Sequence, residues 1–499
     1  MSENIFVTLN GERVSALVGS TVSEIANGEM PCGGNGRCGK CKVFAKGALS
    51  ELSRSEKELL SEKEIASGIR LACSARVLGE CEISTFEPHK DAVAVTDGKM
   101  PQIALKPIFS HFGVSIDVGT TTLAARLYNV SGIVLASATA LNPQSVLGAD
   151  VISRIKASLE GNSEKLKNII VDAVDALIAD LCSKADIAPC AIDALVITGN
   201  TAMLYLLVGS SPRALSCAPF EADRLFDEEM MASELGLSSL SSTAKICLPP
   251  CISAFVGADT VCALLATELC DTDGTRLMVD VGTNGEIALF SGGSLFVCST
   301  AAGPAFEGVG ISCGMRGEDG AIDKVRLVNG TPLVHVLGDK QAVGICGSGI
   351  VDAISVLLDL EVIDETGYME DEETTLAKGV TLTQADIRAV QLAKGAISAG
   401  ISTLLHTSKL DKNDIDELLI AGGFGSHLDV RNAVRIGLIP NCAPSKINSV
   451  GNAALSGASM LLLNAELSQK AKEIANSARV TELASNPTFA EFYMSAMMF

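Results

Sequence analysis

The sequence predicts two folded parts, a small α+β part at the amino terminus and a larger α/β part that follows it. Three observations indicate this division. Alternating strand patterns and a short helix lead into a cysteine-rich loop within the first 73 residues. A proline-containing segment without hydrophobic periodicity covers residues 86–110. Beyond it, apolar strands end in glycine-rich turns, a pattern typical of α/β proteins.

The composition narrows the class of protein. Of the 499 residues, 47% are hydrophobic, which is enough to bury more than one core. The formal charge of −21 opposes binding to nucleic acid, and no apolar run of about 18 residues indicates a membrane span. The first residues, MSENIFVTLN, lack the basic and apolar regions of a secretory signal. We therefore expect a cytoplasmic protein whose 16 cysteines do not form a disulfide framework.

The first elements follow from local patterns. Residues 5–9 and 14–18 alternate between apolar and polar side chains, as strands with one buried face do. The dipeptide Asn10-Gly11 between them is typical of a two-residue hairpin. Residues 21–28 then predict a short helix before the cysteine loop.

Four cysteines have the spacing of iron–sulfur ligands. Cys32, Cys38 and Cys41 form a C-x5-C-x2-C loop, and Cys73 follows after 31 intervening residues. A 2Fe–2S cluster needs four thiolates, and a glycine-rich loop of three with a distant fourth suits it. Zinc is the alternative, although zinc sites normally pair two short C-x2-C hooks. Cys81 lies in an alternating strand pattern and is interpreted as a packed residue instead of a ligand.

The order strand, hairpin, strand, helix and cluster loop resembles the β-grasp ferredoxins, and the loop spacing resembles their vertebrate-type members. The resemblance implies a 2Fe–2S domain over residues 1–86, followed by a linker over residues 87–111. A flexible tether of roughly 20 residues would reach about 25 Å.

The first 100 residues hold 12 basic and 14 acidic side chains, against 26 and 45 in the rest. Four basic residues near the loop predict either a solvated loop or a basic docking rim: Arg37, Lys40, Lys42 and Lys46.

Two D-x-G-T turns between apolar strands lie 163 residues apart, the first turn at residues 117–122 and the second turn at residues 280–285. An Asp there can hold a hydrated magnesium ion, a Gly lets the backbone approach a phosphate, and Thr or Asn donate to phosphate oxygens. Neither turn matches the G-x-x-x-x-G-K-[ST] loop, which excludes a P-loop ATPase. The candidate residues are Asp117, Gly119, Thr120, Thr121, Thr122, Asp280, Gly282, Thr283, Asn284 and Gly285.

A third turn, formed by Gly422, Gly423 and Phe424, follows an apolar strand that begins at Glu417. Glycines at this place would let the backbone lie flat against an adenosine. The ordered set of three turns resembles the actin, sugar kinase and Hsp70 superfamily, whose ATPase domain has two lobes of the ribonuclease H-like fold. The resemblance implies binding of ATP and Mg²⁺, with lobe I over residues 112–270 and lobe II, including carboxyl-terminal helices, over residues 271–499.

Asp259 is the third candidate for catalysis, beside Asp117 and Asp280. It lies in residues 255–264, which resemble the helix start where sugar kinases of this superfamily keep a catalytic Asp. The resemblance implies that Asp259 orients or deprotonates the attacking water. The alternative is an acidic residue that only stabilises the amino terminus of a helix.

A ferredoxin joined to such an ATPase resembles the reductive activators of corrinoid proteins, which use ATP to return cobalt(II) to cobalt(I). Further segments carry this resemblance: Asn142-Pro143-Gln144 with Gly148 and Asp150, Thr198-Gly199-Asn200-Thr201, and residues 303–307, 314–317, 344–349 and 489–499. The resemblance implies an ATP-hydrolysing iron–sulfur reductase that passes one electron to cobalt for methyl transfer. It also implies two partners, the corrinoid protein of a methyltransferase system and a low-potential electron donor. Homodimers are common in the superfamily.

Two other functions fit the same motifs. In a redox-regulated small-molecule kinase, Asp259 would activate a substrate hydroxyl, and the cluster would only sense the redox state. In a nucleotide-responsive ferredoxin, the second part would bind nucleotide without turnover. Phosphorylation of a sugar or an acid would indicate the kinase, and nucleotide binding without hydrolysis would indicate the ferredoxin.

Overall fold

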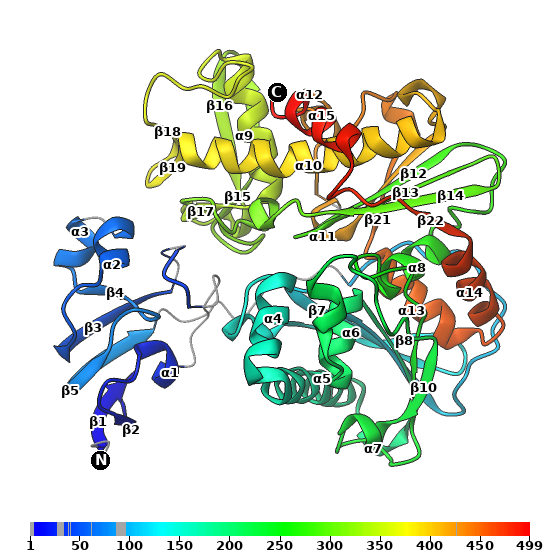
Figure 1. Cartoon of the computed structure of the whole chain (residues 1–499), viewed down its shortest axis with the longest axis horizontal. Coiled ribbons are helices and arrows are strands. Elements are labelled where there is room, and N and C mark those ends of the chain that lie inside the picture. Colours follow the sequence, from blue (N-terminus) through cyan, green and yellow to red (C-terminus); the bar gives the residue numbers. More distant parts are fainter. Residues whose placement is uncertain are drawn as a thin grey trace. The chain divides into compact units, whose positions relative to one another are not determined.

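The computed structural model describes residues 4–26, 34–37, 39, 41–60, 62–85, 96–425 and 427–499. These residues form two compact units. The first unit contains the described residues within 1–90, 142–173 and 205–218, and the second unit contains the others. Figure 1 shows their helices and strands, coloured along the chain.

A five-stranded sheet with the order β2-β1-β5-β3-β4 forms the amino-terminal part. Its strands are β1 (Asn4–Leu9), β2 (Glu12–Leu17), β3 (Lys42–Leu49), β4 (Ile69–Leu71) and β5 (Val77–Thr85). Strands β1 and β5 are parallel, whereas the other neighbours are antiparallel. The predicted hairpin is confirmed, since β1 and β2 pair across Asn10 and Gly11. Both turn residues have positive φ, 50° and 86°, which Asn and Gly tolerate best.

Three short helices accompany this sheet: α1 (Val22–Ala26), α2 (Arg54–Leu59) and α3 (Glu62–Ala66). Helix α1 lies within the predicted range of residues 21–28. The core between them contains Val7, Val22, Leu71, Val77 and Ile83, each almost fully buried.

A buried ion pair joins α2 to β4. Arg70 Nε donates to Glu56 Oε1 over 2.7 Å, and the backbone N–H groups of Leu71 and Ser53 also donate to this carboxylate, over 3.1 and 2.8 Å. Burial by itself raises the pKa of Glu56, but the hydrogen bonds from Arg70, Ser53 and Leu71 outweigh it and hold the pKa below the ordinary value. The carboxylate therefore stays ionised and fixes the end of β4 just before Cys73.

Two larger sheets in the second unit repeat one strand plan, β10-β11-β9-β6-β7-β8 and β21-β20-β12-β13-β14-β22. The first sheet contains β6 (Phe112–Val118), β7 (Thr122–Asn129), β8 (Val134–Leu141), β9 (Ile192–Gly199), β10 (Glu228–Met231) and β11 (Lys245–Leu248). The second contains β12 (Arg276–Val281), β13 (Gly285–Ser291), β14 (Ser294–Thr300), β20 (Glu417–Ala421), β21 (Ile447–Gly451) and β22 (Ala478–Val480).

In each sheet, the first three strands along the chain are each antiparallel to the next, and two later strands add in parallel beside the first of them. Strand β9 is parallel to β6, and β11 is parallel to β9. In the same way, β20 is parallel to β12, and β21 is parallel to β20. Strands β6 and β12 are therefore equivalent, and each leads into one of the two D-x-G-T turns.

Twelve further α-helices are described along the chain, of which α4 and the first half of α5 belong to the first unit. Their bounds are α4 (Val151–Ala157), α5 (Ser163–Ala185), α6 (Thr201–Val208), α7 (Ala232–Leu235), α8 (Ala258–Ala266), α9 (Gly347–Asp359), α10 (Gln384–Ser408), α11 (Gly422–Gly425), α12 (Val430–Arg435), α13 (Ala453–Leu463), α14 (Leu467–Ser477) and α15 (Pro487–Ser495). Helix α13 packs on α8, β6 and β9, so one buried cluster runs from the first sheet to the second. Helix α10 packs on β13 and β14, and α15 lies along α10 (Figure 1).

Two small sheets complete the second unit. One has the order β16-β15-β17 and contains β15 (Ala321–Val328), β16 (Thr331–Val336) and β17 (Gly344–Ile345). The other pairs β18 (Glu373–Ala377) with β19 (Val380–Thr383). Helix α9 packs on β15, which connects the first of these sheets to the main core.

Residues 96–110 run along the second unit in an extended path. Backbone N–H groups of Lys99, Lys106 and Ile108 donate to the carbonyls of residues 450, 463 and 462, over 2.9 to 3.1 Å. This part of the predicted linker is therefore not a free tether, and residues 86–95 lie outside the described residues. The sequence could not indicate this attachment, because a single extended segment that pairs with the end of a strand and the end of a helix has no hydrophobic periodicity of its own.

Candidate functional site

The second unit brings the three predicted catalytic aspartates into one site. Asp117 lies near the end of β6, Asp280 near the end of β12, and Asp259 in the first turn of α8. Each is partly exposed, and repulsion between the carboxylates acts across all three pairs. Glu286, which faces Asp280 across the β12–β13 pair, adds a fourth carboxylate to this cluster.

The protonation of this cluster follows from burial and from mutual repulsion. Burial raises the pKa of Asp117 to about 7, and repulsion from Asp259 and Asp280 adds to it. Burial and the charge of Asp259 raise the pKa of Asp280 to about 7, and burial raises that of Asp259 to about 6. Burial, with repulsion from Asp259 and Asp280, also raises the pKa of Glu286 well above its ordinary value. A cation bound among these groups would relieve the repulsion.

No three His, Cys, Asp or Glu side chains among the described residues are close enough to hold a metal ion unaided. Magnesium typically keeps several waters and binds through one or two carboxylates together with phosphate oxygens. The donor set of the cluster therefore fits a hydrated magnesium ion that enters with a nucleotide.

The first turn is tight, and its threonines have defined partners. The N–H of Gly119 donates to the carbonyl of Thr122 over 3.0 Å. The Thr121 hydroxyl donates to Glu307 Oε2 over 2.6 Å, and Asn200 Nδ2 donates to the Thr120 hydroxyl over 3.0 Å. The turn thus presents its hydroxyl groups from a fixed backbone.

The second turn repeats this geometry. The N–H of Gly282 donates to the carbonyl of Asn284 over 3.1 Å, and Gly285 begins β13. The Thr283 hydroxyl donates to Glu307 Oε1 over 2.8 Å. One carboxylate, Glu307, therefore accepts from a threonine of each turn and ties the two turns together.

The third turn meets the second at Asp280. Gly422 has φ of +87°, and a Cβ atom there would lie only 2.5 Å from Asp280 Oδ1. Only glycine fits this approach. The Phe424 ring stacks on the ring of Phe306 with centroids 5.0 Å apart, while Gly423 is exposed. The third turn is thus fixed by aromatic packing beside the carboxylate cluster.

Four residues of this site were not among the predicted ones: Asn200, Glu286, Glu307 and Asn452. Asn200 and Glu307 belong to segments that the resemblance singled out, but no role could be assigned to them from the sequence. Glu286 follows the second turn by one residue. Asn452 Nδ2 donates to Asp117 Oδ2 over 3.0 Å, and no local signal near residue 452 indicates this bond.

The Asn142-Pro143-Gln144 segment has a structural role. Arg154 is fully buried, and its Nε donates to the Gly148 carbonyl over 2.8 Å. The guanidinium also donates to Gln144 Oε1 over 3.4 Å, while Gln144 Nε2 donates to the Leu166 carbonyl over 3.0 Å. These bonds satisfy a buried charge and hold the turn before α4.

Two of the four predicted cluster ligands lie in contact. The sulfur atoms of Cys41 and Cys73 are 3.2 Å apart, next to the paired strands β3 and β4. Cys41 is buried, and Cys73 is half-buried. The contact with Cys41 is the main cause that lowers the pKa of Cys73 to about 6. Cys32 and Cys38 lie outside the described residues.

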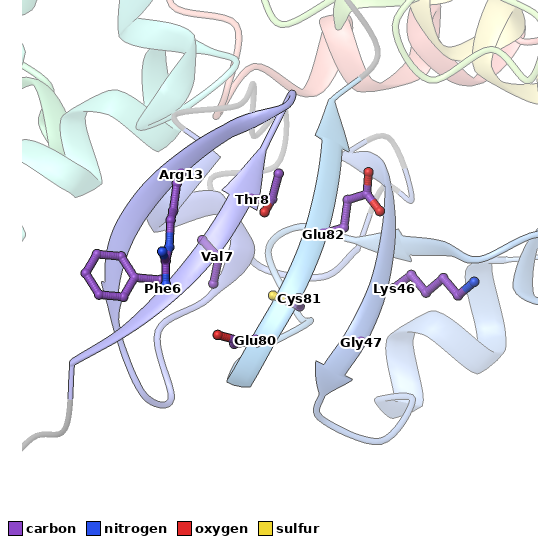
Figure 2. Close-up of a pocket in the computed structure, with 9 residues that line it drawn as sticks. All are labelled: Phe6, Val7, Thr8, Arg13, Lys46, Gly47, Glu80, Cys81 and Glu82. Atoms are coloured by element: carbon purple, nitrogen blue, oxygen red, sulfur yellow. The ribbon is translucent and has the colours of Figure 1, made fainter.

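Cys81 lies in a different place. It lines an open groove formed by β1, β3 and β5, and Figure 2 shows it between Glu80 and Glu82. Its side chain is buried in the sheet core, and burial raises the pKa of its thiol. These features agree with the interpretation of Cys81 as a packed residue.

The predicted basic rim is partly neutralised. Lys42 Nζ lies 2.6 Å from Glu64 Oε1 in an ion pair. Lys46 lines the groove of Figure 2 together with Glu80 and Glu82. Arg37 is exposed, and Lys40 lies outside the described residues. Two of the four basic side chains therefore have acidic neighbours in the same sheet or helix layer.

Two sheets of one plan, with an aspartate turn on each and carboxylates gathered at these turns, are the architecture of a nucleotide-binding ATPase domain. Comparison with known proteins identifies the family. A model described as the RACo middle region matches residues 112–272, and one described as the C-terminal domain of RACo, the ASKHA domain, matches residues 274–499.

Related proteins agree with these matches. The corrinoid activation enzyme RamQ of Eubacterium limosum is 36% identical over 428 residues, 79% of this chain and 71% of RamQ. A [Co(II) methylated amine-specific corrinoid protein] reductase of Methanosarcina barkeri is 26% identical over 420 residues, 78% of this chain and 77% of the reductase. A solved structure of a reductive activator for corrinoid, iron-sulfur protein is 27% identical, with a TM-score of 0.74. The match covers 99% of this chain and 98% of the activator.

This chain belongs to the RACo family, and the predicted resemblance to corrinoid activators is confirmed. Its carboxyl-terminal domain is an ASKHA domain, the class that comprises actin, sugar kinases and Hsp70-like proteins, as the three turns predicted. Within the described part of the chain, no helix has both the length and the apolar character needed to cross a bilayer.

Proposed function

We propose that this protein is an ATP-dependent reductive activator of a corrinoid protein. It passes one electron from a 2Fe–2S cluster to cobalt(II) and so regenerates the cobalt(I) that methyl transfer requires. The observation that carries this proposal is the gathering of Asp117, Asp259 and Asp280 at one site, in a chain that also pairs Cys41 with Cys73. The names of the related activation enzyme and reductase support the same reaction.

The proposed cluster ligands are Cys32, Cys38, Cys41 and Cys73, in a β-grasp ferredoxin domain over residues 1–86. The close contact of the Cys41 and Cys73 sulfurs fits ligands that share one metal centre. The lowered pKa of Cys73 favours the thiolate form that binds iron. The order of the five strands supports the β-grasp assignment. When bound, a 2Fe–2S cluster supplies one electron at low potential.

The nucleotide site has proposed roles for each turn. Asp117 and Asp280 hold the water shell of the magnesium ion, and the first and second turns donate to phosphate oxygens. The third turn lies against the adenosine. Asp259 orients the attacking water or accepts its proton. Burial raises the pKa of Asp259 to about 6, and a general base works best with a pKa close to the working pH.

ATP serves to drive an unfavourable electron transfer. A one-electron step that is uphill by about 150 mV leaves only about one reduced product in 350, since each 59 mV costs tenfold. We propose that lobe I (residues 112–270) and lobe II (residues 271–499) close on nucleotide and hold the corrinoid partner. Hydrolysis then releases the partner before the electron returns. The reductant is a separate low-potential electron donor.

The test mixes the reduced protein with a cobalt(II) corrinoid protein under anaerobic conditions and follows the absorbance of cobalt(I). We expect growth of this absorbance with Mg-ATP and almost none without nucleotide or with the variant Asp117→Ala. Equal growth in all three samples would refute the proposed coupling. Phosphorylation of a sugar or acid by the purified protein would instead indicate a kinase.

A further inference from the structure

Asn452 uses three polar groups to bind three different parts of the second unit. It caps α13, where its Oδ1 accepts from the N–H of Leu455 over 2.8 Å. Because a backbone N–H must meet an oxygen, this bond fixes the orientation of the side-chain amide. Nδ2 is thereby turned to Asp117 Oδ2, 3.0 Å away. The backbone N–H of Asn452 donates to the carbonyl of Asp97 over 3.1 Å.

Asp97 belongs to the segment through which the chain enters the ATPase domain. Residues 97–99, the entry segment, pair with residues 450–452. Gly98 and Gly451 form an antiparallel bridge, and the N–H of Lys99 donates to the carbonyl of Val450 over 3.0 Å. Arg126 donates to the carbonyl of Thr96 just before this pairing. The entry segment is therefore held by backbone bonds to residues 450–452, and the residue before it is held by the Arg126 side chain.

Two glycines make this contact unusually close. A Cβ atom on Gly98 would lie 2.4 Å from the carbonyl oxygen of Asn452 and 2.5 Å from the Ser456 hydroxyl. A Cβ atom on Gly451, whose φ is +68°, would lie 2.2 Å from the carbonyl oxygen of Asp97. Neither position accepts a side chain without displacing backbone, so the entry segment and the start of α13 move together.

We propose that Asn452 is a positioning residue of the ATPase site, and that the entry segment holds it against Asp117. This inference rests on the proposed function, because it takes Asp117 as the carboxylate that holds the magnesium ion. The iron–sulfur part of the chain is covalently joined to the ATPase domain through this segment. A displacement of the segment thus reaches Asp117 through two hydrogen bonds. The backbone N–H of Asn452 donates to the carbonyl of Asp97, and Nδ2 of Asn452 donates to Asp117 Oδ2.

The side-chain role of Asn452 is tested with two variants that separate capping from positioning. Asn452→Ser keeps an N-cap oxygen but is too short to reach Asp117, whereas Asn452→Ala loses both functions. We expect Asn452→Ser to melt close to the wild-type temperature, with kcat for Mg-ATP hydrolysis at least tenfold lower and KM changed less than threefold. A misplaced catalytic group commonly costs up to about a hundredfold in rate. Wild-type kcat in Asn452→Ser would overturn the positioning role.

The role of the entry segment is tested with Gly98→Val in the full-length protein. The control is Met100→Val, which introduces the same side chain at an exposed position two residues away. We expect the kcat of Gly98→Val to drop about as much as that of Asn452→Ser. Met100→Val should keep wild-type kinetics. Trypsin cleavage at the exposed Lys99 reports whether the segment has been released.

The outcomes decide the inference separately from the proposed function. Loss of kcat in Gly98→Val supports it, whether or not Lys99 becomes cleavable. Wild-type kcat in Gly98→Val overturns it, because a segment displaced by the valine side chain would then leave Asp117 and ATP hydrolysis undisturbed. Absence of ATP hydrolysis in the wild-type protein would refute the proposed function. Normal wild-type hydrolysis with unaffected variants would refute only the coupling through Asn452.

Discussion

Asp280 lies among three other carboxylates, and its protonation links the nucleotide site to stability. An Asp in the unfolded chain has a pKa of about 3.9, whereas burial and the charge of Asp259 raise the pKa of Asp280 to about 7 in the folded protein. Between these values the folded protein binds more protons than the unfolded chain. The free energy of unfolding therefore falls as the pH rises from about 4 to 7.

We accordingly expect Asp280→Asn to stabilise the nucleotide-free protein at pH 8 while abolishing Mg-ATP hydrolysis. The melting temperature should rise by about 2–4 °C, which corresponds to roughly 1 kcal/mol for a domain of this size. The difference should shrink toward pH 5, where the native carboxyl is already protonated. Asp319→Asn, at an exposed position, is the control. An equal rise at both pH values would contradict the assignment.

Glu307 is the residue that joins the first and second turns. Its two oxygens accept from Thr121 and Thr283, whereas Gln has one accepting oxygen and no charge, so it could keep only one of these bonds in its present direction and would weaken both. We expect Glu307→Gln to lower kcat for ATP hydrolysis at least tenfold, because the two turns would no longer be held at one separation.

The control for Glu307→Gln is Glu482→Gln, which removes an exposed carboxylate of the same unit. Steady-state hydrolysis and binding of ADP should be measured on both variants. If Glu307→Gln hydrolyses ATP at the wild-type rate, the bridge is not needed for the arrangement of the turns.

At the scale of elements, the buried pair of Glu56 and Arg70 determines how β4 is placed before Cys73. Removal of one partner leaves the other charged and buried, which typically costs about 3–5 kcal/mol. We expect Glu56→Ala to lose its iron–sulfur absorbance at a lower urea concentration than the wild type. Glu58→Ala is a matched control, since Glu58 lies on the same helix in an exposed pair with Arg54. Equal urea midpoints for the two variants would contradict this role of Glu56.

Elements that depend on local patterns were predicted well. The β1–β2 hairpin forms at Asn10-Gly11, and β20 ends at the third turn, because a turn type or a strand end is set by a few adjacent residues. Residues 87–111 were predicted as a linker, but the described part of it, residues 96–110, is fastened along α13 and β21. The hydrogen-bond partners of Lys99, Lys106 and Ile108 are more than 300 residues away along the chain, so no local pattern could indicate them.

At the scale of the whole molecule, the two chemistries should be separable. We expect Cys73→Ser to lose the iron–sulfur absorbance and cobalt reduction while it keeps most of its ATP hydrolysis. Asp117→Ala should show the reverse, with normal iron content and no hydrolysis. Iron content, visible absorbance and phosphate release measure the two sets of properties. Loss of ATP hydrolysis in a folded Cys73→Ser variant would show that the cluster region itself controls turnover.

The sequence by itself determined the motifs of this protein, namely the four cysteines and the three glycine-rich turns. Their chemistry depends on residue types at characteristic spacings, which a chain displays before it folds. The tertiary structure decided which groups complete the proposed ATPase site. Glu307 meets Thr121 from 186 positions away, and Asn452 meets Asp117 from 335 positions away. Such pairs form only when the two sheets and α13 pack together, because burial of their apolar faces brings distant polar groups to the same place.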